Sequence, residues 1–147
     1  DGLQDPSNVG AILRAAEAFG AGGVVLTPGT ASPYAPKAFR ASAGSALRVA
    51  VVKNVLSTDA VAWSREIGAT LAGADAHDGE DPDALRGVSP VVLAVGSEGH
   101  GLSAPVVSAL DRRVRIPVSP RVESLNAAVA AGILLYALSP KTSARKR

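Results

Sequence analysis

Short apolar runs rich in valine alternate along this chain with segments of helical periodicity, and no other feature constrains the possible folds as much. About five runs have the length and β-branched content of buried strands, namely residues 24–27, 47–52, 70–74, 91–95 and 113–117. Strands that alternate with helices pair in parallel, because each crossover helix returns the chain to the same edge of the sheet. The sequence therefore predicts an α/β domain with a mostly parallel sheet and helices on both faces.

The first expected helix has clear start and stop signals. Asp5 and Pro6 begin it, since an acid can cap a helix and proline suits the first turn, and Gly20 ends it. The later helices are expected over 37–43, 57–67 and 104–110. Ser57 is the candidate cap of the helix at 57–67, and Trp63 within it is expected to pack in the core.

A last helix is expected over 124–138, and it is apolar nearly all round beyond Asn126. A helix of this kind is buried on several sides, either in the core of its own domain or against a second subunit. The pattern alone does not separate these two alternatives. Ser124 at the start of this segment is a candidate cap.

Composition excludes several classes of function. The chain has 147 residues, enough for one domain, and no cysteine, so disulfides and thiolate chemistry are excluded. The two histidines are far apart in sequence, and no metal site is expected. No apolar run approaches the roughly 20 residues that span a bilayer, and the polar start is unlike a signal peptide. The lack of any methionine suggests a trimmed or excised domain.

The positive charge is concentrated at the carboxyl end. Four basic residues lie in 141–147, and the rest of the chain has 11 basic and 13 acidic side chains, a net charge of −2. This is not the strongly basic surface of a protein that grips nucleic acid unaided. We expect 140–147 to be a flexible basic tail, with a phosphate-contacting arm as the alternative.

A glycine-rich loop follows the apolar run 91–95. It reads GSEGHG, with glycines at 96, 99 and 101 and the single acid Glu98. Glycines after a buried strand let the backbone approach a ligand, but they are equally typical of a tight turn. The glycine order is the reverse of a dinucleotide fingerprint, and the lysine of a phosphate-binding P-loop is missing. The loop alone leaves a small-molecule site and a plain turn as alternatives.

Several polar residues have an ordinary structural explanation when each is taken alone. Arg14 lies beside the apolar stripe of the first helix and could simply be solvated. Asn8 could bond its own backbone near the helix start. His100 adjoins the glycine loop, without a readable serine and acid partner for a hydrolase triad.

Taken together, three blocks of sequence resemble the SpoU (TrmH-type) RNA ribose 2′-O-methyltransferases of the SPOUT superfamily. These are DPSNVGAILRAAEAFG from Asp5, VVLAVGSEGHGLS from Val91 and IPVSPRVESLNAAVAAGILLYAL from Ile116, and the segment KAFRASAGSA from Lys37 is also similar. The resemblance makes residues 1–139 a methyltransferase domain. Residues 1–3 resemble the end of the family's first strand, so most of that strand would be absent.

The resemblance implies a fold and a cofactor that periodicity could not show. The fold would be α/β with a deep trefoil knot at its C-terminal end, working as a homodimer and binding S-adenosylmethionine in the knot. Carried over by motif, backbone groups of Gly96, Ile116 and Leu125 would hold this cofactor. The same pocket would be lined by Ala94, Gly99 and Pro117. The family's catalytic and binding set would correspond to Asn8, Arg14, Glu98, Ser124 and Asn126.

The chemistry of methyl transfer limits the role of Arg14. A ribose hydroxyl is a poor nucleophile until it loses its proton or is polarised. The resemblance implies a general-base arginine, but a guanidinium has no acceptor lone pair at ordinary pH. We therefore expect Arg14 to bind the neighbouring phosphate and to stabilise the developing alkoxide, with Asn8 and Glu98 orienting it.

The resulting hypothesis is a cytoplasmic, S-adenosylmethionine-dependent methyltransferase that acts on the ribose of rRNA or tRNA. No membrane or metal partner is expected. One alternative is a non-catalytic RNA-binding or assembly module with the same fold. The other is a knotted methyltransferase that modifies a base instead of a ribose.

Overall fold

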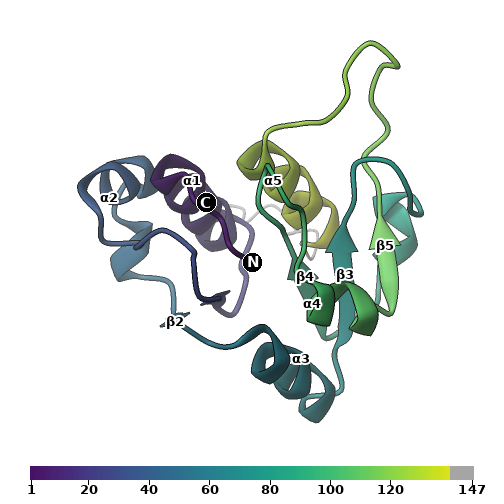
Figure 1. Ribbon diagram of the computed structural model, residues 1–147, viewed down its shortest axis with the longest axis horizontal. Coiled ribbons are helices and arrows are strands. Elements are labelled where there is room, and N and C mark those ends of the chain that lie inside the picture. The colour runs from purple at the N-terminus through teal and green to yellow at the C-terminus, as the bar shows by residue number, and fades with distance from the viewer. Residues whose placement is uncertain (140–147) are drawn as a thin grey trace, which may run out of the picture.

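The computed structural model describes residues 1–139, in which helices and short parallel strands alternate (Figure 1). The elements are α1 (Pro6–Ala18), β1 (Val24–Leu26), α2 (Pro36–Ser42), η1 (Ser45–Leu47), β2 (Val51–Lys53), α3 (Ser57–Glu66), β3 (Thr70–Ala74), η2 (Pro82–Leu85), β4 (Val91–Ala94), α4 (Ala104–Ala109), β5 (Arg112–Val114) and α5 (Ala127–Leu138). The expected tail at 140–147 lies outside the described residues.

All pairings between the strands are parallel, which confirms the predicted α/β class. The strands form two hydrogen-bonded groups, however, with orders β1-β2 and β4-β3-β5. Val24 lies opposite Val51 in the first group, and Ala72 lies opposite both Leu93 and Arg112 in the second. Because every strand runs the same way, the loops that follow them meet at one edge of the molecule.

Residues 1–3 lie between the ends of the two groups. The main-chain nitrogen of Asp1 donates to the carbonyl of Val95, just beyond β4, at 2.7 Å. On the other side, the Gly2 N–H donates to the Thr27 hydroxyl, just beyond β1, at 3.0 Å. Leu3 is buried in the core. This segment therefore joins the two strand groups at their carboxyl edge.

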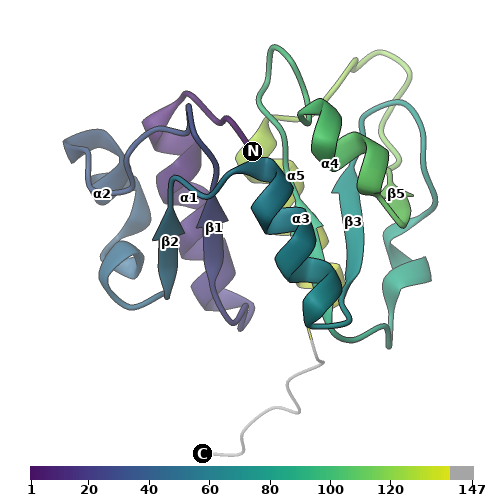
Figure 2. The same ribbon diagram turned by 60° about the horizontal axis from the view of Figure 1, so that its bottom comes forward.

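Helices cover both faces of the strands, as predicted. In Figure 2, α3 and α4 lie in front of the strands, while α1 and α5 lie behind them. One cluster of buried side chains includes Leu13 of α1 and Leu26 of β1, and a second includes Val114 of β5. Helix α5 belongs to both, through Ala127 in the first cluster and Leu134 in the second. Helix α5 therefore packs against both strand groups and joins them on the face that it shares with α1.

The structure corrects several expected boundaries. The run 47–52 is not one strand, because η1 ends at Leu47 and β2 covers only Val51–Lys53. Ser57 is the first residue of α3, and the cap position belongs to Leu56. Trp63 is 45% exposed, so its expected place in the core was wrong: it lies on the outer face of α3. The acidic segment before β4 contains η2, whose Leu85 is buried.

The start of α5 also differs from the expected position. The helix begins at Ala127, and Asn126 is its cap, with a side-chain oxygen that accepts from the N–H groups of Ala128 and Val129. Ser124 was the expected cap, but it lies before this turn. Because the amide of Asn126 already satisfies two free N–H groups, the helix has no need of the serine. The trefoil knot stays a prediction from the family resemblance.

Among residues 1–139, no helix combines the length and apolar character needed to cross a lipid bilayer.

Candidate functional site

The glycine-rich loop after β4 closes on itself. Ser97 and Gly101 exchange two main-chain hydrogen bonds, with N–O distances of 3.1 and 2.9 Å. At Gly96, a Cβ would lie 2.2 Å from the carbonyl carbon of Gly101, and Gly101 has φ +65°. A side chain at position 96 would therefore collide with backbone, and one at 101 would strain it. These two glycines are required by the closed shape of the loop.

Gly99 differs from the other two glycines of the loop. No atom of the described chain lies within 4 Å of the place that a Cβ would take, and its φ lies outside the left-handed region. Neither packing nor backbone conformation therefore demands glycine at this position. An exposed backbone without a side chain is what a ligand would need to approach the loop closely. The tight-turn explanation therefore holds for Gly96 and Gly101, and the small-molecule site at Gly99 stays a prediction.

Three of the predicted polar residues are joined in one chain of hydrogen bonds. Asn8 of α1 donates through Nδ2 to Oε1 of Glu98 in the glycine loop. Asn126, the cap of α5, donates through Nδ2 to Oδ1 of Asn8 at 3.0 Å. Asn8 itself is buried, whereas Glu98 and Asn126 are exposed. Residues from three separate sequence blocks therefore meet at the carboxyl edge of the strands.

The start of α5 determines how these amides are oriented. The oxygen of Asn126 faces the N–H groups of α5, so its NH₂ group must face Asn8. Asn8 then presents its oxygen to Asn126 and its own NH₂ group to Glu98. Reversing either amide would place donor against donor. The N-terminal, positive end of the α5 dipole is thus linked to the Glu98 carboxylate through the side-chain amides of Asn126 and Asn8.

Arg14 and Ser124 are not part of this chain. Arg14 follows Asn8 by six residues on α1, which places it roughly 120° around the helix. It is exposed, and none of the ion pairs among residues 1–139 involves it. Ser124 is also exposed, two residues before the cap of α5. The structure therefore does not bring Arg14 to Glu98 within one chain, and its orientation by Asn8 and Glu98 stays a prediction.

The predicted cofactor residues lie on three segments near the same edge. Ala94 ends β4 and is followed by the glycine loop, while Ile116 and Pro117 follow β5. Since β3 separates β4 from β5, the two strand ends are roughly 10 Å apart. Leu125 lies just before the cap of α5, at the end of the long segment that arches back from β5 (Figure 1). No atom of these segments is shown to bind a cofactor, so this grouping stays a prediction.

A hollow of about 590 Å³ lies on the α3 and α4 side of the glycine loop. Its walls come from residues 1–4, the turn after β1, the start of α3, the glycine loop and the start of α4; they include Asp1, Gly29, Ser57, Ser97, His100 and Ser103. Asp1 is the residue here that sequence reasoning missed. Its resemblance to the end of the family's first strand gave it no role in the site, and only the contacts that it makes across the fold single it out.

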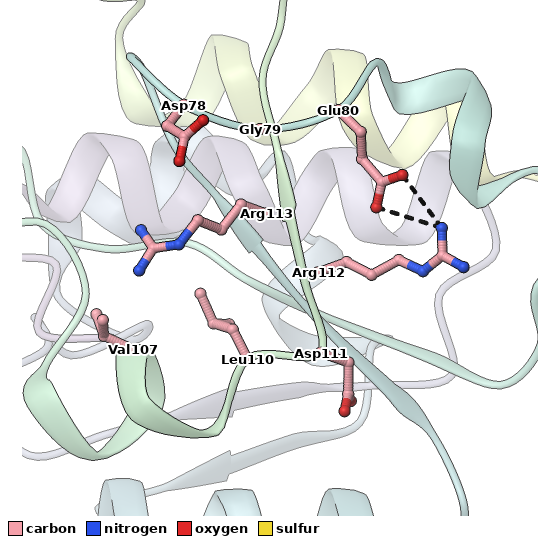
Figure 3. A pocket seen from close by; sticks show the side chains of 8 residues that line it. All are labelled: Asp78, Gly79, Glu80, Val107, Leu110, Asp111, Arg112 and Arg113. Carbon is pink, nitrogen blue, oxygen red and sulfur yellow. Dashed lines mark hydrogen bonds and ion pairs between the residues drawn. The ribbon is translucent and has the colours of Figure 1, made fainter.

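A second hollow, of about 580 Å³, lies beside β5, and none of the predicted site residues lines it (Figure 3). Glu80 and Arg112 pair across it at 3.2 Å, and Arg113 pairs with Asp75 at 2.9 Å. Figure 3 shows Val107 of α4 and Leu110, just beyond that helix, on the opposite wall. Both arginines of this hollow are thus engaged in ion pairs. Within residues 1–139, no group of three side chains is arranged to hold a metal ion.

The ion pairs nearest the site stabilise the start of α1 and its outer face. The Ser7 N–H and the Lys37 ammonium hold the pKa of Asp5, the cap of α1, below its ordinary value. Further along the helix, hydrogen bonding to Arg48 lowers the pKa of Glu17 to about 2. These exposed pairs link α1 to α2 and to the turn after η1.

Comparison with known proteins places this geometry in a family. The model of the SpoU rRNA methylase family matches residues 1–136. The chain belongs to the SpoU rRNA methylase family. An uncharacterised tRNA/rRNA methyltransferase of Mycobacterium bovis is 40% identical over 139 residues, which are 95% of this chain and 43% of that protein. The chain thus spans less than half the length of this curated relative.

Two solved SpoU-type structures have the same arrangement. The AdoMet-bound rRNA methyltransferase from Sinorhizobium meliloti has a TM-score of 0.85 and 32% identity, over 92% of this chain and 52% of that one. A structure described as an RNA 2′-O ribose methyltransferase has a TM-score of 0.81 and 32% identity, again over 92% of this chain and 52% of that one. The similarity therefore covers nearly the whole SpoU domain described above.

Proposed function

We propose that this SpoU-family chain transfers a methyl group from S-adenosylmethionine to a ribose 2′-hydroxyl of rRNA or tRNA, in the cytoplasm where these RNAs function. The observation that carries the proposal is the hydrogen-bonded chain of Asn8, Glu98 and Asn126 beside an open glycine loop. The similar structures named as an AdoMet-bound enzyme and as a 2′-O ribose methyltransferase support the cofactor and the position methylated.

The described residues fit an S-adenosylmethionine site. Open backbone at Gly99 leaves space for a ligand, and the strand ends at Ala94 and Ile116 face the same edge. Main-chain groups of Gly96, Ile116 and Leu125 would hold the cofactor, with Ala94, Gly99 and Pro117 lining the pocket. The bound sulfonium would supply an activated methyl group. The rest of the chemistry is the positioning of a ribose oxygen in line with it.

The polar residues have separate roles in this proposal. Asn8 and Asn126 hold Glu98 in place, and Oε2 of Glu98 accepts no hydrogen bond within residues 1–139, so it remains available to the substrate or to Arg14. Ser124 would shape the pocket beside it. Arg14 would bind the phosphate next to the target ribose and stabilise negative charge on the attacking oxygen.

We further propose that the chain acts as a homodimer through the outer surface of α1 and α5. Val129, Ile133 and Tyr136 of α5 are 50%, 40% and 69% exposed and share one helix face. The Tyr136 ring packs edge-on against Phe19 of α1 at 5.6 Å. A partner on this surface would also lie close to the exposed Arg14 on α1.

Two measurements test the function. Titration calorimetry with S-adenosylmethionine should show binding, and its absence would favour the non-catalytic RNA-binding module. Methylation of total RNA from a strain that lacks the protein, followed by nucleoside mass analysis, should place the added mass on the ribose. A methyl group on the base would identify the knotted base methyltransferase instead.

Arg14→Lys tests the role of the arginine. Lysine keeps the positive charge but lacks the planar guanidinium, which can bind phosphate through two parallel N–H groups. We expect the methylation rate to fall by roughly tenfold or more, with S-adenosylmethionine binding unchanged. Near-normal turnover would refute both arginine roles, as base and as stabiliser. Arg65→Lys is the matched control, since Arg65 lies on α3 away from the site.

A further inference from the structure

Asp1 contacts both ends of the glycine loop. Its main-chain nitrogen donates to the carbonyl of Val95, immediately before the loop, at 2.7 Å. Its side-chain Oδ2 accepts from the N–H of Ser103, immediately after the loop, at 2.7 Å. Both ends of the loop 96–102 are thus hydrogen-bonded to the same residue, although Asp1 is more than 90 positions away in sequence.

The other carboxylate oxygen of Asp1 ties this point to two further elements. Oδ1 accepts from the hydroxyl of Thr27, at the end of β1, at 2.8 Å, and from the hydroxyl of Ser57, at the start of α3, at 3.2 Å. The Ser103 hydroxyl in turn donates to Ser57 at 3.1 Å. Three segments therefore meet at one carboxylate, and the main-chain nitrogen of Asp1 adds a fourth, the end of β4. Hydrogen bonds of this kind, with a charged acceptor, are stronger than neutral ones.

The loop has few other constraints on its position. Glu98, Gly99, His100 and Gly101 are all exposed. Within the loop, the hydrogen bonds between Ser97 and Gly101 fix its shape but not its place on the fold. Besides its covalent links to β4 and α4 and the approach of Leu102 to Gly73 of β3, the loop is tied to the fold by the hydrogen bonds of Asp1 at its base and of Asn8 with Glu98 at its tip.

We propose that Asp1 is a positioning residue that fixes the glycine loop at its base, and so sets the geometry of the methyl-donor site. The inference rests on the proposed function only for the identity of the ligand that the loop binds. A loop displaced by a fraction of a bond length would lose backbone contacts with its ligand, since such contacts depend on close approach.

The test compares Asp1→Asn with Asp111→Asn in this chain. Asp111 is the matched control, because its carboxylate also accepts from a main-chain N–H, that of Leu71, and from another element through Arg65, but away from the loop. In Asp1→Asn we expect amide hydrogen exchange at Ser97 and Gly101 to accelerate about tenfold, with the β3 amides unchanged. S-adenosylmethionine affinity should fall by about tenfold, and Asp111→Asn should change neither.

Hydrogen exchange and cofactor affinity distinguish a failure of this inference from a failure of the proposed function. If the unmodified chain does not bind S-adenosylmethionine, the proposed function fails, while exchange at Ser97 and Gly101 still decides the role of Asp1. Unchanged exchange at these two amides, or an equal acceleration in β3, would overturn the positioning role. If Asp1→Asn does not fold, Thr27→Val removes one donor and leaves the carboxylate in place. It should then produce a smaller effect of the same kind, and no effect would count equally against the proposal.

Discussion

At the scale of single residues, two glycines of the same loop should respond oppositely to one added methyl group. Gly96→Ala would place a Cβ 2.2 Å from backbone, so we expect a loss of stability of about 1–3 kcal/mol. At Gly99 the same change meets open space, and stability should stay within about 0.5 kcal/mol. Denaturant unfolding and calorimetry with S-adenosylmethionine measure the two effects. For Gly99→Ala we expect weaker binding in a stable protein, and unaltered affinity would contradict the role of Gly99 in the pocket.

Asn126 combines two tasks that substitution can separate. Its oxygen caps α5, and its NH₂ group holds Asn8. Asn126→Ser keeps a cap but loses the donor, whereas Asn126→Ala loses both and should cost about 1 kcal/mol of stability. We expect both variants to lower the methylation rate by roughly tenfold or more, with only the alanine variant less stable. If the serine variant keeps full activity, the amide chain to Glu98 is not needed for catalysis.

At the scale of elements, the link between α1 and the turn after η1 should depend on pH. Arg48 contacts both carboxylate oxygens of Glu17, at 2.5 and 2.9 Å. Hydrogen bonding to Arg48, and less so to the Ser45 hydroxyl, lowers the pKa of Glu17 from 4.5 to about 2. Because the folded pKa is lowered, the contact stabilises the fold fully above pH 4.5, and this contribution is lost as pH falls toward 2.

Carboxyl carbon NMR checks this prediction directly. Glu17 should titrate near pH 2, and in Arg48→Ala its pKa should return toward 4.5. Arg86→Ala, which removes an exposed ion pair with Asp83, is the control and should leave Glu17 unchanged. A Glu17 that titrates normally in the unmodified protein would show that the ion pair does not persist in solution.

Some helices and strands could be predicted from the sequence, and others could not. Apolar periodicity located α1, α3, β3, β4 and α4 closely, because their inward faces are set by local spacing. The division into two strand groups could not be predicted, since it depends on how residues 1–3 pack between distant segments. The start of α5 was misplaced because Ser124 and Asn126 are both good caps, and in the structure the oxygen of Asn126 accepts from the first N–H groups of the helix.

The candidate site, too, could be predicted only in part from the sequence. The residue types at positions 8, 98 and 126 pointed to a polar site through their resemblance to a family, but their hydrogen bonds join positions 90 and 118 apart in sequence. No local pattern encodes such contacts. Asp1 was predicted only as part of a strand end, and its proposed positioning role rests on its contacts with four segments.

At the scale of the whole molecule, the outer surface of α1 and α5 should determine the oligomeric state. Helix α5 buries Ala131 and Leu134 inward, but it leaves Val129, Ile133 and Tyr136 exposed on the other side. An apolar helix face of this kind costs free energy in water unless a partner covers it. Arg14 lies on the neighbouring helix with no ion pair within residues 1–139, so a second chain would bring polar groups within its reach.

The prediction is that Ile133→Glu converts a dimer into a monomer and reduces methylation, because a buried charge without a partner opposes association. Sedimentation velocity measures the first effect, and methyl incorporation into RNA measures the second. Val52→Glu is the control, since Val52 is 56% exposed on β2, away from this surface, and the variant should remain dimeric. A monomeric unmodified protein with full activity would show that one chain forms the complete site, and Arg14 would then have to reach Glu98 by a movement of its own side chain.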